Sequence, residues 1–219
     1  MLNHIGETSS SYRMILAVFI ICLISEALTG CNRAGARIPG ASLAFPETTT
    51  GYVATKQLPS VATVLMPIDA RPQHYDERIA GTDWTACSTD PFWTDTATSI
   101  VRDRLVRELE SSRLFRQVSQ GPPSTNDLII RSEIRAFCSQ VVGFIIGTVA
   151  GISSINVDVE QNGKRILSKT FERVVTDDDP EYTGLKIATI EQAMVTSMGD
   201  SLRELLRDVL KHLDTSLSR

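Results

Sequence analysis

Apolar residues recur at helical spacing in two stretches of the chain. The stretch over residues 95–113 predicts an amphipathic helix, with one face formed by Ala97, Ile100, Val101, Leu105 and Leu109. A longer apolar stripe predicts a second helix over residues 190–213. Thr189 and Gln192 stand at the spacing of a capping box, so we expect the second helix to begin beside them.

Strands are predicted where apolar and polar residues alternate. The clearest alternation covers residues 127–139, where one face is formed by Leu128, Ile130, Ile134, Ala136 and Cys138. This pattern turns Cys138 toward the core. Shorter β-branched or apolar runs predict strands at residues 61–66 and 115–118.

A β-hairpin is predicted around Asn162-Gly163, because this dipeptide favours a type I′ turn. The alternating run that ends at Glu160 enters the turn, and a strand over residues 164–175 leaves it. With a two-residue turn, Glu160 would pair with Arg165 and Val159 with Ile166.

The order of these elements predicts an α/β (α+β) fold. We expect a mixed or antiparallel sheet of four to five strands, with two helices packed on one face. One domain would cover residues 61–219. Residues 31–60 are rich in Ala, Gly, Pro and Thr and lack apolar periodicity, which predicts a flexible tether before the domain.

The uncharged segment Val141–Gly151 has glycine at every fourth position from Gly143. Eleven residues are too few to span a bilayer as a helix, and the flanking runs alternate as strands do. We therefore expect an apolar hairpin. Its Phe144, Ile145 and Ile146 would either be tucked onto the core or form a contact surface for lipid or a protein partner.

The amino terminus has the order of a secretory signal, with Arg13 before the uncharged run Met14–Ile24. The run is too short for a membrane-spanning helix, and it lacks the polar positions of an amphipathic core helix. The four residues Leu28-Thr29-Gly30-Cys31 that follow resemble the lipobox of bacterial lipoproteins.

This resemblance implies that residues 1–30 are a signal peptide and that Cys31 carries a diacylglycerol, with an acyl chain such as palmitate on the new amino end. The protein would then be anchored to a membrane and face the periplasm. Asn32 is not the aspartate that favours inner-membrane retention in related systems, so we expect the outer membrane.

The remaining cysteines are Cys87 and Cys138, because Cys22 leaves with the signal. An even number in an oxidising compartment predicts a disulfide between them, and two free buried thiols are the alternative. Neither cysteine has His or Cys neighbours at ligand spacing, so no metal site is expected.

Charge and motifs favour a protein without catalytic activity. The chain has 22 Lys and Arg against 26 Asp and Glu and no basic cluster, which argues against a nucleic-acid partner. His74 lies beside Asp69, Arg71 and Asp76 and would be the centre of any hydrolase, but no nucleophile motif accompanies it. We expect no enzyme and no cofactor, and His212 is expected to be solvated.

Three further features resemble small lipoproteins of the YajG type: Pro67-Ile68-Asp69 followed by Arg71, the strand over 127–136, and the Asn162-Gly163 hairpin. The resemblance implies a structural, assembly or binding role, with an envelope protein as partner. The order of elements also resembles auxiliary lipoproteins of ABC-type lipid transport systems. A transport auxiliary is therefore a second hypothesis, and a hydrolase is the third.

Overall fold

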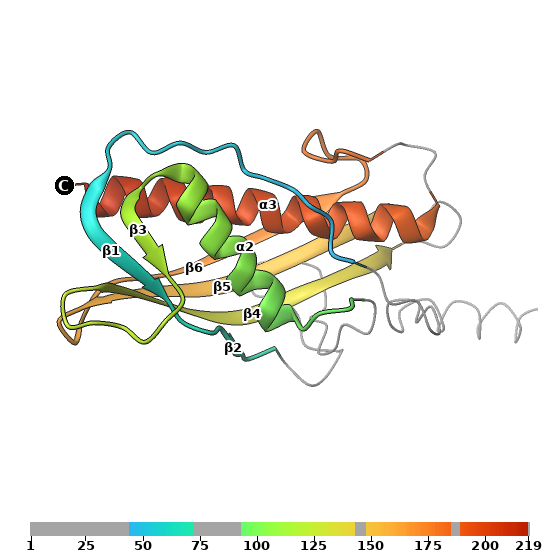
Figure 1. Ribbon diagram of the computed structural model, residues 1–219. Helices are drawn as coiled ribbons and strands as arrows, with labels where there is room; N and C mark the ends of the chain where they lie inside the picture. The colour runs from blue at the N-terminus through green and yellow to red at the C-terminus, as the bar shows by residue number, and fades with distance from the viewer. Residues whose placement is uncertain (1–43, 72–92, 143–147, 185–188, 219) are drawn as a thin grey trace, which may run out of the picture.

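The computed structural model describes residues 44–71, 93–142, 148–184 and 189–218. Within these ranges a six-stranded mixed sheet is covered on one face by two helices (Figure 1). The elements are β1 (Leu58–Val64), β2 (Ile68–Asp69), α2 (Ala97–Ser112), β3 (Phe115–Ser119), β4 (Leu128–Val142), β5 (Thr148–Gln161), β6 (Lys164–Thr176) and α3 (Ile190–Leu217). The expected fold class is confirmed, with the short β2 as an additional strand.

The sheet has a parallel part and an antiparallel part. Its strand order is β3-β1-β4-β5-β6, and β2 pairs with β4 outside this path. β1 is parallel to β3 and β4, and a parallel pair needs a crossover, which α2 supplies between β1 and β3. β4, β5 and β6 form an antiparallel meander that lies under α3.

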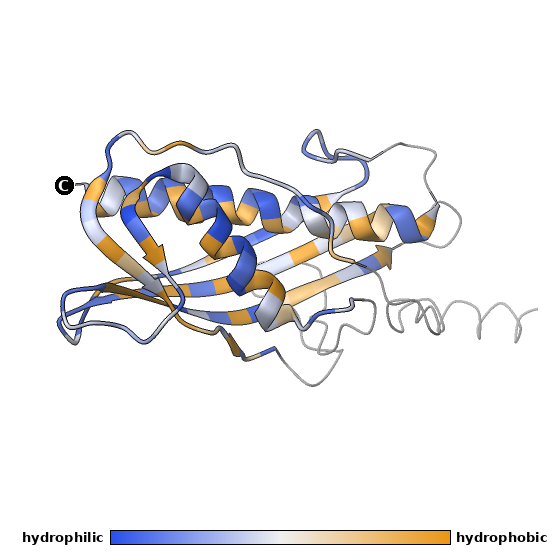
Figure 2. Cartoon of the chain, in the orientation of Figure 1, coloured by the Kyte–Doolittle hydropathy of each residue, from blue (hydrophilic) through white to orange (hydrophobic). Residues whose placement is uncertain are grey.

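Both helices begin and end at residues that cap them. The Thr96 side chain accepts a hydrogen bond from the Ser99 backbone N–H, and Arg113 closes α2 in the left-handed conformation with φ of 57°. The capping box of Thr189 and Gln192 is present at the start of α3. Apolar and polar residues alternate around both helices (Figure 2), as expected for amphipathic helices packed on a sheet.

The face that β4 turns toward the helices changes in the middle of the strand. Ile134 pairs with Ile155 and Ala136 with Ser154, so Arg135 is an extra residue that interrupts the ladder. Beyond it, Phe137 lies in the main core, whereas Cys138 lies in a second buried cluster with Ala136, Ala150 and Ile152. The expectation that Cys138 shares a face with Leu128 is therefore wrong, because strict alternation does not survive a bulge.

The hairpin between β5 and β6 follows the prediction at its turn and departs from it one residue later. Asn162 and Gly163 have φ of 52° and 74°, and Glu160 pairs with Arg165. Val159 pairs with Leu167, however, because the register shifts at this point. The predicted partner Ile166 is left 45% exposed.

The predicted apolar hairpin is present between β4 and β5, because Val142 pairs with Thr148 and Val141 with Val149. The two flanks of Val141–Gly151 are therefore strands. Phe144, Ile145 and Ile146 lie outside the described residues.

The domain begins earlier in the chain than expected. β1 starts at Leu58, and residues 44–57 run across α2 and α3 in extended contact with both (Figure 1). We call residues 44–57 the strap. Within the described ranges no helix combines the length and apolar character needed to cross a bilayer.

Candidate functional site

A set of polar contacts in the described chain holds the strap to the two helices. At the start of the strap, the Phe45 ring contacts the rings of Trp93 and Phe137, with centroid distances of 5.0 and 5.6 Å. Pro46 then crosses α3 at Gly199. A Cβ at Gly199 would lie 2.5 Å from Cγ of Pro46, so any larger residue here would make the strap shift.

Arg104 of α2 binds the beginning of the strap. Arg104 is 6% exposed, and its guanidinium donates to the carbonyl oxygens of Pro46 and Thr48 and to the carboxylate of Glu47, which lies 3.0 Å away. Burial lowers the pKa of Arg104, and the charge of Glu47 opposes that effect. A planar fork of donors suits several oxygens at once, which explains an arginine at this position.

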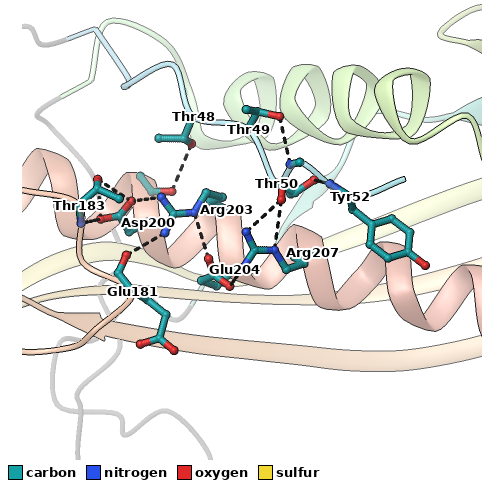
Figure 3. Close-up of polar contacts among 12 residues, drawn as sticks. Thr48, Thr49, Thr50, Tyr52, Glu181, Thr183, Asp200, Arg203, Glu204 and Arg207 are labelled. Carbon is teal, nitrogen blue, oxygen red and sulfur yellow. Dashed lines mark hydrogen bonds and ion pairs between the residues drawn. The ribbon is translucent and has the colours of Figure 1, made fainter. Parts of the chain in front are cut away.

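Thr50 is held between the helices from both sides. Its backbone N–H and its hydroxyl donate to the buried carboxylate of Glu108 on α2. Its carbonyl oxygen accepts from the Nε and Nη2 atoms of Arg207 on α3, at 3.2 and 3.0 Å (Figure 3).

A chain of charges continues along α3 from Arg207 (Figure 3). Glu204 accepts from Arg207 at 2.7 Å and from Arg203 at 3.0 Å. Arg203 also donates to Asp200, at 2.6 Å. Asp200 is fully buried and accepts the backbone N–H of Thr183 at 2.7 Å, so the same chain holds the loop after β6.

The end of the strap is fixed by Asp214, which is buried near the carboxyl end of α3. Its carboxylate accepts from the Tyr52 hydroxyl at 2.8 Å and from the Thr55 backbone N–H at 2.9 Å. Burial alone would raise the pKa of Asp214, but the hydrogen bonds from Thr55, Tyr52 and Ser218 outweigh it and lower that pKa. Burial and the neighbouring Asp214 raise the pKa of Tyr52 to about 12.

This arrangement is suited to holding a segment in place. Each of the buried charges at Arg104, Glu108, Asp200 and Asp214 has hydrogen-bond partners that satisfy it. A hydrogen bond to a charged group typically contributes about 1.5–3 kcal/mol, so the bonds that Arg104, Glu108 and Asp214 make to strap residues fix its path. In the described ranges no group of three or more His, Cys, Asp or Glu side chains could hold a metal ion.

Most of the residues singled out from the sequence do not lie in this arrangement. Cys31, His74, Cys87 and the three residues Phe144–Ile146 lie outside the described residues. Cys138 is buried on the face of the sheet opposite the helices.

Two of the remaining candidates have structural partners. Asp69 and Arg71 form an ion pair at 2.8 Å, and Arg71 also donates to the carbonyl oxygen of Phe137. The hydrogen bond from Arg71 lowers the pKa of Asp69. His212 is not simply solvated as expected, because its ring packs edge-on against Phe171 with a centroid distance of 5.6 Å.

The strap residues were missed because helix side chains bind largely the strap's own backbone N–H and carbonyl groups, which leave no pattern in a sequence. One signal was present in α2. Arg104 and Glu108 directly precede Leu105 and Leu109 and share their spacing of four, so both charges border the apolar stripe. Charges at such a border are half-turned toward the core and need partners there.

Comparison with known proteins shows the fold and does not assign a family. Neither a scan against protein-family models nor a search of the curated proteins finds a match. Among solved structures, a Xanthomonas campestris protein of the family DUF330 is 16% identical with a TM-score of 0.58, covering 81% of this chain and 97% of that one. A minor lipoprotein from Acinetobacter baumannii is 12% identical with a TM-score of 0.37, covering 72% of this chain and 91% of that one. At 16% identity, the first likeness means that the two chains share a fold.

Proposed function

We propose that this chain is a lipid-anchored lipoprotein of the bacterial cell envelope, facing the periplasm, with a non-enzymatic structural, assembly or binding role. The observation that carries the proposal is Leu28-Thr29-Gly30-Cys31 after the uncharged run Met14–Ile24. The strap is bound to both helices, so a lipid on Cys31 would hold the whole domain through it.

The length of this connection sets how far the domain can stand from the membrane. Thirteen peptide bonds separate Cys31 from Ala44. A fully extended chain covers about 3.3–3.6 Å per residue, so the tether reaches at most about 45 Å. The strap enters over the half of β4 that leads to the β4–β5 hairpin, as the contact between Phe45 and Phe137 indicates. The strap therefore begins over the hairpin end of the domain.

Labelling with a radioactive or clickable palmitate tests the anchor. Cys31→Ser should abolish the label and leave an uncleaved or soluble chain. Cys22→Ser, in the same amino-terminal region, is the matched control and should keep both the label and cleavage. Normal labelling of Cys31→Ser would contradict the lipoprotein proposal.

The choice of membrane rests on Asn32, which in related systems is not a retention signal. Density-gradient fractionation of the envelope should find the chain with the outer membrane. Asn32→Asp should move it to the inner-membrane fraction, and an unchanged distribution would contradict this part of the proposal.

The hairpin between β4 and β5 is the proposed contact surface. In the sequence, Phe144, Ile145 and Ile146 lie between Val142 and Thr148, which pair across the two strands. Burial of such side chains against lipid or protein gives about 1.5–3 kcal/mol each. A structural or assembly partner and an ABC-type transport subunit would both fit an apolar hairpin.

Crosslinking in the envelope, followed by identification of the captured protein, separates these roles. Phe144→Ser with Ile146→Ser should lose the captured partner while the free energy of unfolding stays unchanged. The matched control is Val53→Ser with Ile166→Ser, which are 66% and 45% exposed elsewhere on the domain. If the hairpin variant unfolds, the segment is part of the core. If the control variant loses the captured partner to the same extent, capture does not depend specifically on the hairpin.

A disulfide between Cys87 and Cys138 remains part of the proposal. Cys138 is 4% exposed, on the face of the sheet opposite the helices. The bridge would close a loop of about fifty residues, worth roughly 4 kcal/mol in the chain-entropy model. Two thiols that titrate in unreduced, unfolded protein, beyond any from Cys31, would rule it out.

A further inference from the structure

Two side chains of α3 bind the loop after β6, whose described part is residues 177–184. Arg203 donates to the carbonyl oxygen of Glu181 at 2.8 Å. Asp200 accepts from the backbone N–H of Thr183 at 2.7 Å and from its hydroxyl at 3.1 Å. Arg203 and Asp200 also bind each other, at 2.6 Å. The part of the loop around Thr183 is therefore held by one ion pair of α3.

The strap passes over this ion pair. It contacts α3 at Gly199, where the Thr48 hydroxyl donates to the backbone carbonyl oxygen at 3.5 Å, and again at Arg207 through the Thr50 carbonyl oxygen. Arg203 lies four residues from each contact, and residues four apart share a helix face. Only 12% of the Arg203 side chain is exposed (Figure 3). The strap therefore shields Arg203 from water.

A shared carboxylate connects the strap to the ion pair that holds the loop. Glu204 accepts from Arg207 with Oε2 at 2.7 Å and from Arg203 with Oε1 at 3.0 Å. Its side chain is 13% exposed. Opposite charges attract more strongly where water is excluded. Release of the strap would admit water and free Arg207 from the Thr50 carbonyl oxygen, so it would weaken the bonds that hold Arg203 against the loop.

We propose that the strap and the loop after β6 open and close as one unit, coupled through Arg203, Glu204 and Arg207. Neither segment contributes a strand, so both can open while the sheet stays folded. The loop is also bonded to β5, because Asp177 and Val149 exchange two hydrogen bonds of 3.0 Å. The unit therefore joins the strap to the base of the β4–β5 hairpin. The coupling does not depend on the lipid anchor, whereas its use in the envelope rests on the proposed function.

Native-state hydrogen exchange of the full chain in detergent tests the coupling. Two backbone N–H groups report on it, because that of Thr50 donates to Glu108 and that of Thr183 donates to Asp200. In the unsubstituted chain both should have the same free energy of opening. That free energy should lie below the value for Val157 in β5, whose exchange reports unfolding of the sheet.

Thr50→Val loosens the strap without altering its bonds to Arg207. The change removes the hydroxyl that donates to Glu108 and keeps the carbonyl oxygen that accepts from Arg207. Exchange at positions 50 and 183 should speed up by the same factor, about tenfold or more, because a hydrogen bond to a charged group is lost. Thr49→Val, the same change at the exposed neighbouring residue, is the matched control and should leave both rates unchanged.

Glu204→Gln tests the shared carboxylate. An amide offers one acceptor oxygen in place of two, so it cannot bind both arginines. In this variant, the further change Thr50→Val should speed exchange at position 50 alone, and continued coupling would overturn the role of Glu204. If Thr50→Val by itself leaves exchange at Thr183 unchanged, or if both positions open only together with Val157, the strap and the loop do not form a local unit and the proposal is wrong.

Discussion

The two halves of α3 pack on the same sheet by opposite means. In the amino-terminal half, small residues let the helix backbone approach the strand closely. In the carboxyl-terminal half, large aliphatic side chains fill a wider space. The interface between α3 and the sheet therefore has one region where added side-chain atoms are destabilising and another where removal of side-chain atoms is destabilising.

The amino-terminal half is confined on both sides. A Cβ at Gly151 of β5 would overlap the backbone carbonyl of Ser197. Farther along, the hydroxyls of Ser153 and Ser201 lie 2.7 Å apart, between helix and strand. On the outer side, Pro46 of the strap contacts Gly199. Only residues with few side-chain atoms fit between three layers of backbone at this spacing.

The carboxyl-terminal half depends on filled volume. Its fully or almost fully buried residues are Leu205, Leu206, Val209, Leu210 and Leu213. They belong to one core cluster with Ile155, Val157 and Val159 of β5. Here the strap is held by polar side chains, Arg207 and Asp214, which leave the apolar face of the helix to the sheet.

The largest effect should come from adding atoms in the amino-terminal half. Gly151→Val would drive a branched side chain into the Ser197 carbonyl, and we expect a loss of more than about 4 kcal/mol in the free energy of unfolding. Gly121→Val is the matched control, because a Cβ there meets its nearest atom at 3.6 Å. Denaturant unfolding measures both. A loss below about 1 kcal/mol at Gly151 would contradict the close approach.

Removing atoms from the carboxyl-terminal half should come next. Leu205 is fully buried, and Leu205→Ala should cost about 3 kcal/mol through lost burial and a cavity. Leu217→Ala, in the same helix but only partly buried, should cost clearly less. Equal losses at the two positions in denaturant unfolding would show that side-chain volume is not what holds this half.

A smaller and more local effect is expected at the crossing of the strap. Gly199→Ala places a methyl group 2.5 Å from Cγ of Pro46, while alanine also favours the helix by about 1 kcal/mol. The net loss of stability should be about 1 kcal/mol, because the strap can shift. Trypsin should cut faster after Lys56, within the strap.

The double variant Gly199→Ala with Pro46→Ala is the control for this crossing. Loss of the ring Cγ removes the overlap, so the rate of cleavage after Lys56 should return toward that of the unsubstituted chain. If the double variant is cut as fast as Gly199→Ala, the contact with Pro46 does not control the strap.

The contrast between the halves also explains which features could be predicted from the sequence. The large residues of α3 recur at helical spacing, and Thr189 with Gln192 marks its start, so this element was predictable. The close approach at Gly151 was not, because glycine in a strand indicates either a bend or a tight contact and the pattern does not distinguish them.

The bulges and the strap were beyond pattern reasoning for related reasons. An extra residue such as Arg135 or Ile166 changes the face of every residue after it, and nothing in the local alternation marks the position. The strap is extended and bound largely through backbone carbonyls to Arg104 and Arg207. Its composition was therefore that of a tether, although it is part of the packed domain.

The smallest effect is expected at His212, in the carboxyl-terminal half. Burial, reinforced by the charge of Lys169, lowers the pKa of the His212 imidazole where it packs on Phe171. The unfolded chain therefore takes up this proton at higher pH than the folded chain does. The free energy of unfolding should fall as the pH drops below about 6.5, and it should level off below the folded pKa.

His212→Gln should remove this slope in unfolding curves measured above about pH 5, and Lys169→Gln should reduce it. Carboxylates such as Asp214, whose pKa is lowered, titrate below this window. An unchanged slope in His212→Gln would show that the ring against Phe171 is not the group that titrates.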